Sequence, residues 1–140
     1  AGEIDQDYLY WAGDATIYNN QMQMLWGAVD NTDENNLMRR FGTCLVTYSL
    51  EGKPGDDTYM KLISRNDDFN DHTLGYGDTM WEDEDGHTYL YTTSNYKVAV
   101  ARTATHDLSS QWEYYVADPQ GNFSWTTEYP STQDAEYSTI

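Results

Sequence analysis

Acidic side chains dominate the residues that could do chemistry in this sequence, which holds 24 Asp and Glu residues against 7 Lys and Arg. Two aspartates lie in matching Gly-Asp pairs, and these residues, Asp14 and Asp78, are 64 positions apart (78 − 14). An Asp beside a glycine can accept backbone N–H groups and tie neighbouring strands together. It can also face a ligand. Because the pair recurs, and a catalytic residue need not recur, the repetition favours the framework role for at least one of the two, and Asp78 is the one we expect to have it.

Large aromatic side chains are the second group with chemical potential, since the chain holds 13 Tyr and 5 Trp. Four of them lie within or near the strands that the Gly-Asp pairs introduce. An aromatic ring offers apolar area to the face of a sugar, but rings of this kind also fill the core between packed strands. The sequence leaves both roles open for these four residues: Trp11, Trp26, Tyr76 and Trp81.

Metal binding has weaker support. The chain has no His-x-x-x-His and no paired-Cys pattern, which zinc sites use. Acidic runs at 30–34, 67–71 and 82–85 could supply the clustered oxygens that calcium prefers, yet none has the spacing of an EF-hand loop. We therefore expect solvated turns and no cofactor, with calcium the one open possibility.

The overall charge narrows the set of partners. A formal net charge of −17 disfavours nucleic acid and anionic membrane surfaces, because both need basic patches. Neutral sugars, cations and basic proteins remain compatible with this charge. No apolar stretch reaches the length of a membrane span, so membrane insertion is not expected. The single cysteine, Cys44, allows no intrachain disulfide and is predicted to be a small buried hydrophobe.

The elements that position these residues are predicted to be strands. Apolar residues alternate with polar ones, and Tyr, Thr, Trp and Val are abundant, whereas spacings of three and four are rare. Asn19-Asn20 and Asp85-Gly86 tolerate the positive φ that tight hairpins need. The expected strands are Ala15–Tyr18, Gln21–Trp26, Thr43–Ser49, Tyr59–Ser64, Thr79–Glu82, Thr88–Thr93, Lys97–Arg102 and Trp112–Ala117.

An internal repeat organises these strands. The second halves of the two units align without a gap at an offset of 54 (98 − 44), so the first unit carries a longer connection, residues 28–40, predicted to be an exposed acidic loop. Each unit contains four strands, which is the content of a β-propeller blade. We expect an all-β propeller fragment: a first blade over 1–74, a second over 75–135, and the start of a third at 136–140. Two blades cannot close a ring, so the chain is expected to be a piece of a longer protein or to assemble blades between chains.

Several of these motifs resemble a known family. The Gly-Asp pair, the Asp-Gly turn and the run Tyr89 to Ser94 are similar to blade openings of the five-bladed propeller glycosidases of family 43 and to uncharacterised bacterial relatives of that group. In that family an Asp acts as general base, a second Asp tunes and orients, and a Glu acts as general acid. The resemblance carries these roles onto Asp14, Asp78 and Glu136. Inverting hydrolysis needs its two carboxyl groups about 6.5–9.5 Å apart, which leaves room for the attacking water.

The functional expectation follows from this resemblance. The chain is predicted to be part of a secreted or periplasmic carbohydrate-acting propeller, of glycoside-hydrolase type if it is an enzyme. Its partners would be carbohydrate and the rest of its own propeller or other copies of the chain. Two alternatives stay open. One is a non-catalytic propeller that binds carbohydrate or protein, and the other is a structural surface protein that assembles blades between chains.

Overall fold

The computed structural model describes residues 8–35, 38–94 and 97–130, and this part of the chain forms two antiparallel sheets with no helix. None of the described segments could therefore cross a membrane as a helix. The nine strands are β1 (Tyr8–Tyr18), β2 (Gln21–Asp30), β3 (Arg39–Leu50), β4 (Tyr59–Asn70), β5 (Thr79–Glu82), β6 (Thr88–Ser94), β7 (Lys97–Thr103), β8 (Trp112–Ala117) and β9 (Phe123–Thr126). All eight expected strands are present. The third-blade residues Glu136 to Ile140 lie outside the described residues.

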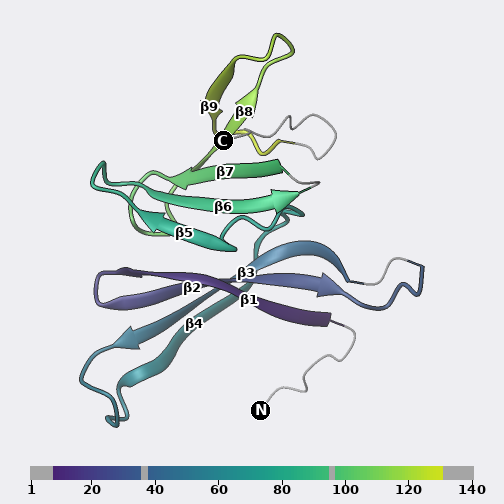
Figure 1. The fold of residues 1–140 in the computed structure, drawn as a ribbon. Coiled ribbons are helices and arrows are strands. Elements are labelled where there is room, and N and C mark those ends of the chain that lie inside the picture. The colour runs from purple at the N-terminus through teal and green to yellow at the C-terminus, as the bar shows by residue number, and fades with distance from the viewer. Residues whose placement is uncertain (1–7, 36–37, 95–96, 131–140) are drawn as a thin grey trace.

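The first sheet has the order β1-β2-β3-β4 and forms the lower layer in Figure 1. Asn19 and Asn20 connect β1 to β2 with φ values of 49° and 59°, which confirms the predicted tight turn. The connection between β2 and β3 is shorter than the expected loop over 28–40. Asp30 pairs with Arg39 in the sheet, so both ends of that range are strand. The apolar side chains of Ala28 and Val29 are fully buried, and their burial extends the hairpin into the polar segment.

Strand β4 also runs further than predicted, to Asn70 instead of Ser64. The charged run that follows Ser64 suggested a loop. Because β4 is the edge strand of its sheet and is exposed along most of its length, it tolerates charged side chains that a central strand would not.

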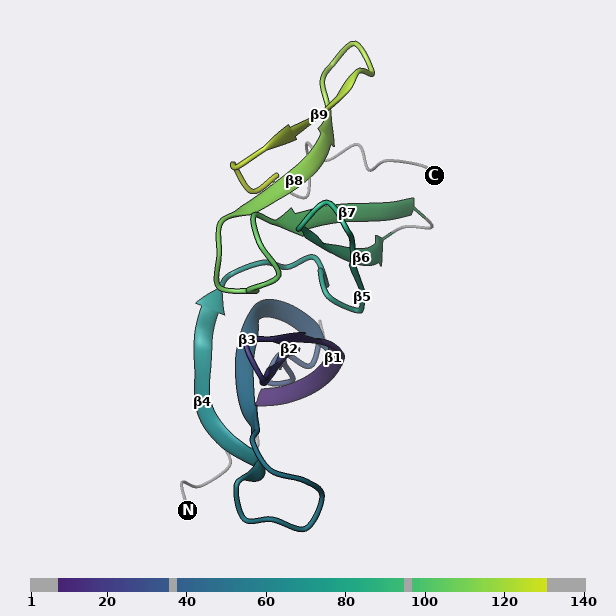
Figure 2. The ribbon, with the colours of Figure 1, turned by 90° about the vertical axis from the view of Figure 1, so that its left-hand side faces the viewer.

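The second sheet has five strands, in the order β5-β6-β7-β8-β9, where four were expected. Strand β9 pairs with β8 through a turn that Asp118 stabilises. Its Oδ1 accepts the backbone N–H groups of Gln120 and Asn122, at 2.9 and 2.8 Å. The resulting β8–β9 hairpin projects away from the first sheet in both views (Figures 1 and 2).

The two sheets share one buried core, and β1 of the first sheet lies against β5 of the second (Figure 1). Leu25 and Leu45 come from the first sheet, and Leu90, Trp112 and Tyr114 are among the residues from the second. The repeat therefore corresponds to two packed sheets, with one Gly-Asp pair in the edge strand β1 and the other directly before the edge strand β5.

Candidate functional site

The two Gly-Asp pairs meet where β1 lies against β5. The backbone N–H of Asp14 donates to the carbonyl of Gly77 at 2.8 Å. A Cβ at Gly13 would lie 2.6 Å from the Gly77 oxygen and 2.9 Å from the Leu25 oxygen, which is closer than any side chain can approach. Glycine is therefore required at residue 13, and the repeated motif is a physical contact between its two copies.

Asp14 is held by backbone groups on both of its oxygens. Oδ1 accepts the N–H of Ala15 at 2.8 Å, and Oδ2 accepts the N–H of Met80 on β5 at 2.9 Å. A carboxylate bound in this way joins the two sheets, which is the framework geometry that the Gly-Asp motif allows.

Glu82, at the end of β5, makes the return connection to β1. Its Oε1 accepts the backbone N–H of Ile17 at 3.0 Å and the hydroxyl of the buried Thr16. Each of the two edge strands β1 and β5 thus supplies one carboxylate to the other. The sequence placed Glu82 in an acidic run and gave no sign of this contact, because its partner lies 65 residues earlier in the chain.

Asp78 differs from Asp14 in exposure and in partners. Its side chain is 52% exposed and forms an ion pair with Arg40 at 3.4 Å. The hydroxyl of Thr92 donates to its other oxygen at 2.6 Å. The carboxylate is therefore fixed in orientation while half of its surface faces solvent, which leaves it able to contact a ligand or a water molecule.

Arg40, which the sequence did not single out, is positioned by two glycines. A Cβ at Gly27 would lie 2.7 Å from the guanidinium carbon, and a Cβ at Gly75 would overlap Nη1. Among the described residues the buried Nε of Arg40 has no hydrogen-bond partner. The absence of side chains at Gly27 and Gly75 thus creates the space through which Arg40 reaches Asp78.

The four predicted sugar-stacking rings divide into two groups. Tyr76 is buried in the core against Trp112 and Tyr114 and offers no free ring face, whereas Trp26 is half-buried. Trp11 and Trp81 are 50% and 63% exposed, on β1 and β5 respectively. Those two rings lie on the same strands as Asp14 and Glu82. Glu136, the predicted acid, lies outside the described residues.

Several carboxylates of the acidic runs bond to residues close to them in the sequence. Asp30 accepts the N–H and hydroxyl of Thr32, and Asp67 pairs with Arg65 at 2.5 Å. Asp85 accepts the N–H of His87 and the hydroxyl of Tyr89, and these bonds lower the pKa of its carboxyl. Within residues 8–35, 38–94 and 97–130, no group of three or more His, Cys, Asp or Glu side chains is arranged to hold a metal ion.

Comparison with known proteins assigns a family. Residues 1–140 match the family described as Domain of unknown function (DUF5005). The chain belongs to this family. No curated protein matches the sequence.

One solved structure is similar to this DUF5005 chain along nearly its whole length. It is the 2.80 Å crystal structure of a protein named "putative hydrolase" from Bacteroides ovatus ATCC 8483. The sequences are 93% identical, the TM-score is 0.90, and the match covers 96% of this chain and 33% of that one. The DUF5005 chain therefore spans about a third of the solved protein, and the two share the fold over that part.

Proposed function

We propose that this chain is part of a carbohydrate-acting hydrolase of β-propeller architecture, secreted or periplasmic, in which Asp78 contacts the substrate. Two packed antiparallel sheets joined along the edge strands β1 and β5 suit consecutive blades. The resemblance to family 43 glycosidases and the hydrolase name of the solved neighbour support the reaction class.

The contrast between the two repeated aspartates carries the proposal. Both carboxylate oxygens of Asp14 accept backbone N–H groups, whereas Asp78 is half exposed and is oriented by Arg40 and Thr92. An oriented, solvent-facing carboxylate can position a water molecule or a sugar hydroxyl.

The roles proposed for Asp14 and Asp78 differ from those that the family resemblance implies. In the proposal Asp14 positions the edge strand β5, and Asp78 is the carboxylate that acts on the glycoside. The second carboxyl that hydrolysis requires is assigned to Glu136 by the same resemblance. The remaining blades would come from the rest of a longer protein, as the length of the solved neighbour suggests.

Hydrolysis assays on the intact protein test this assignment, with aryl arabinosides, aryl xylosides and arabinan as substrates. We expect Asp78→Asn to lower kcat by about 100-fold or more with little change in Tm, the size expected for loss of a general base. Asp14→Asn should lower Tm and leave the turnover of the folded molecules largely intact. Normal turnover in Asp78→Asn would overturn the assignment.

A non-catalytic binding module is the second candidate. The family resemblance assigns a catalytic role to Asp14, but both oxygens of this carboxylate accept backbone N–H groups and are not available for proton transfer. The loss of one of the three expected catalytic carboxylates favours a module that only binds. In that case arabinan or xylan in the gel would slow the wild-type protein in affinity electrophoresis, but the protein would release no sugar from either polysaccharide. Asp78→Asn would then reduce this retardation, and no hydrolysis would be detected for either protein.

A further inference from the structure

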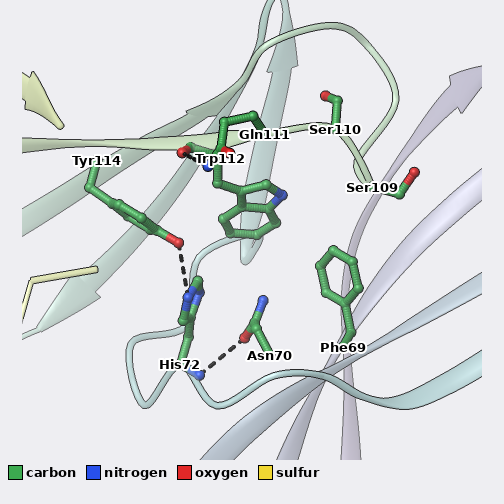
Figure 3. A pocket seen from close by; sticks show the side chains of 8 residues that line it. All are labelled: Phe69, Asn70, His72, Ser109, Ser110, Gln111, Trp112 and Tyr114. Atoms are coloured by element: carbon green, nitrogen blue, oxygen red, sulfur yellow. Dashed lines mark hydrogen bonds between the residues drawn. The ribbon is translucent and has the colours of Figure 1, made fainter. Parts of the chain in front are cut away.

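A pocket of about 320 Å³ lies between the two sheets, away from the contact of β1 with β5. It is formed by the end of β4, the segment that follows it, and the turn that leads into β8 (Figure 3). Eight residues line it: Phe69, Asn70, His72, Ser109, Ser110, Gln111, Trp112 and Tyr114. Its volume is in the range of small-molecule sites.

Two amide side chains in the pocket have unused hydrogen-bonding groups. The Oδ1 of Asn70 accepts the N–H of His72 at 3.1 Å, and its Nδ2 makes no hydrogen bond to any described residue. The Nε2 of Gln111 donates to the carbonyl of Trp112 at 3.0 Å, and its Oε1 is similarly without a partner in the described ranges. The pocket thus presents one free amide donor and one free amide acceptor.

His72 is the buried polar residue of the pocket, with a relative exposure of 6%. Its Nε2 bonds with the hydroxyl of Tyr114 at 2.9 Å, and its ring stacks on Tyr129 at 4.0 Å. Its Nδ1 is buried and has no hydrogen-bond partner among the described residues. A buried nitrogen of this kind is costly unless a bound group satisfies it.

The lining side chains carry no formal charge at neutral pH. Burial lowers the pKa of His72 to about 4, so its ring is neutral, and the other seven lining residues do not ionise near neutral pH. This is unusual in a chain with a net charge of −17. Phe69 and Trp112 contribute apolar ring surface, with their centroids 5.9 Å apart (Figure 3). The exposed lining of the pocket is therefore mainly polar and uncharged, with amides and hydroxyls in front of largely buried rings.

We propose that this pocket binds a neutral sugar residue, as a second carbohydrate site separate from the one at Asp78. Free amide groups and the serine hydroxyls of the lining match the hydroxyls of a sugar, which both donate and accept hydrogen bonds. An acidic sugar would be disfavoured by the strongly negative chain, by Asp71, which adjoins Asn70 and His72 in the sequence, and by Asp107, which accepts hydrogen bonds from Ser109. The proposal rests on carbohydrate being the ligand class of the protein, but not on Asp78 or on hydrolysis.

Saturation-transfer NMR and calorimetry on the intact protein test the site, with D-galactose, D-xylose and L-arabinose as neutral probes and D-galacturonate as the acidic one. We expect at least one neutral sugar to bind saturably, with a millimolar Kd, and galacturonate to bind at least tenfold more weakly. Gln111→Ala should weaken binding about tenfold. Its side chain is exposed, so folding should not suffer. Asn70→Ala should act in the same direction.

Ser124→Ala, an exposed hydroxyl on β9 outside the pocket, is the matched control and should bind as the wild type does. In an Asp78→Asn background, which alters the proposed hydrolytic site, Gln111→Ala should still weaken sugar binding about tenfold, which separates this proposal from that for the hydrolytic site. The absence of saturable binding by all three neutral sugars would overturn the proposal. Equal binding of galacturonate, or binding unaffected by both Gln111→Ala and Asn70→Ala, would overturn it as well.

Discussion

The carboxylate of Asp14 on β1 accepts the backbone N–H of Met80 on β5, with 2.9 Å between oxygen and nitrogen. Glu82 on β5 accepts the backbone N–H of Ile17 on β1 at 3.0 Å. The edge strands β1 and β5 are thus joined by reciprocal carboxylate–amide bonds, although they belong to different sheets. Such bonds need both strands in register, so they couple the folding of one sheet to that of the other.

Removal of the Asp14 carboxylate should therefore destabilise the protein. Asp14→Ala loses two hydrogen bonds to backbone N–H groups, and we expect it to lower the free energy of unfolding by about 2–4 kcal/mol. Glu84→Ala, which removes an exposed carboxylate of the β5–β6 turn, is the control and should cost less than about 0.5 kcal/mol. Urea denaturation of the intact protein measures both. Equal stability of the two variants would contradict the framework role.

His72 should make stability depend on pH between 6.5 and 4. Burial lowers its pKa to about 4 in the folded chain, against 6.5 for an unperturbed imidazole, so the unfolded chain binds more protons in that window. Stability is complete above pH 6.5 and falls as the pH drops toward 4, with about 2 kcal/mol lost between pH 7 and pH 5. Urea denaturation at several pH values measures the slope. His72→Gln should flatten it, and an unchanged slope would assign the dependence to other groups.

Cys44 should resist alkylation in the folded protein. Its thiol is buried and lies 3.1 Å from the Asp67 carboxylate, and burial, followed by that carboxylate, raises the pKa of the thiol to about 12. The reactive thiolate is therefore scarce at pH 8. We expect iodoacetamide to modify Cys44 only after denaturation, as measured by intact mass. Rapid labelling of the native protein would contradict this arrangement.

Residues 1–140 expressed alone should self-associate. Apolar side chains on β4 are unusually exposed, with Leu62 at 52% and Ile63 at 50%, and β4 is an edge strand with one unpaired side in the described structure. Sedimentation velocity should show oligomers, and Leu62→Lys with Ile63→Lys should reduce them. A sharply melting wild-type monomer would argue that these side chains need no partner.

The local parts of this fold could be predicted from the sequence. Alternating apolar residues predicted eight strands. Asn19-Asn20 predicted the two-residue β1–β2 hairpin, and Asp85-Gly86 predicted the longer β5–β6 turn, in which Gly86 has a φ of 93°, because turns are determined largely by the residues within them. Strand β9 was missed, since Pro119 and Gly121 suggested only a loop and the pairing with β8 depends on how Asp118 folds that turn.

The long-range parts could not be predicted in the same way. Arg40 lies 38 residues before Asp78, and nothing near either residue indicates that Gly27 and Gly75 leave room for their ion pair. The sequence interpretation favoured Asp78 as the framework residue because of its neighbouring hairpin. In the structure it is Asp14 that bonds to backbone on both oxygens, while Asp78 faces solvent.

In the contact between the two Gly-Asp copies, the first copy supplies the carboxylate and the second copy supplies backbone groups. Asp14 reaches forward along the chain to β5, and Gly13 fits against Gly77, its own counterpart in the next unit. Duplication of a gene segment that encodes such a unit would also duplicate the Gly-Asp pair. Each new copy would then carry the residues that contact the next copy along the chain. A protein built from such units can gain further units by recombination, with the contact between neighbouring units already present before their packing improves.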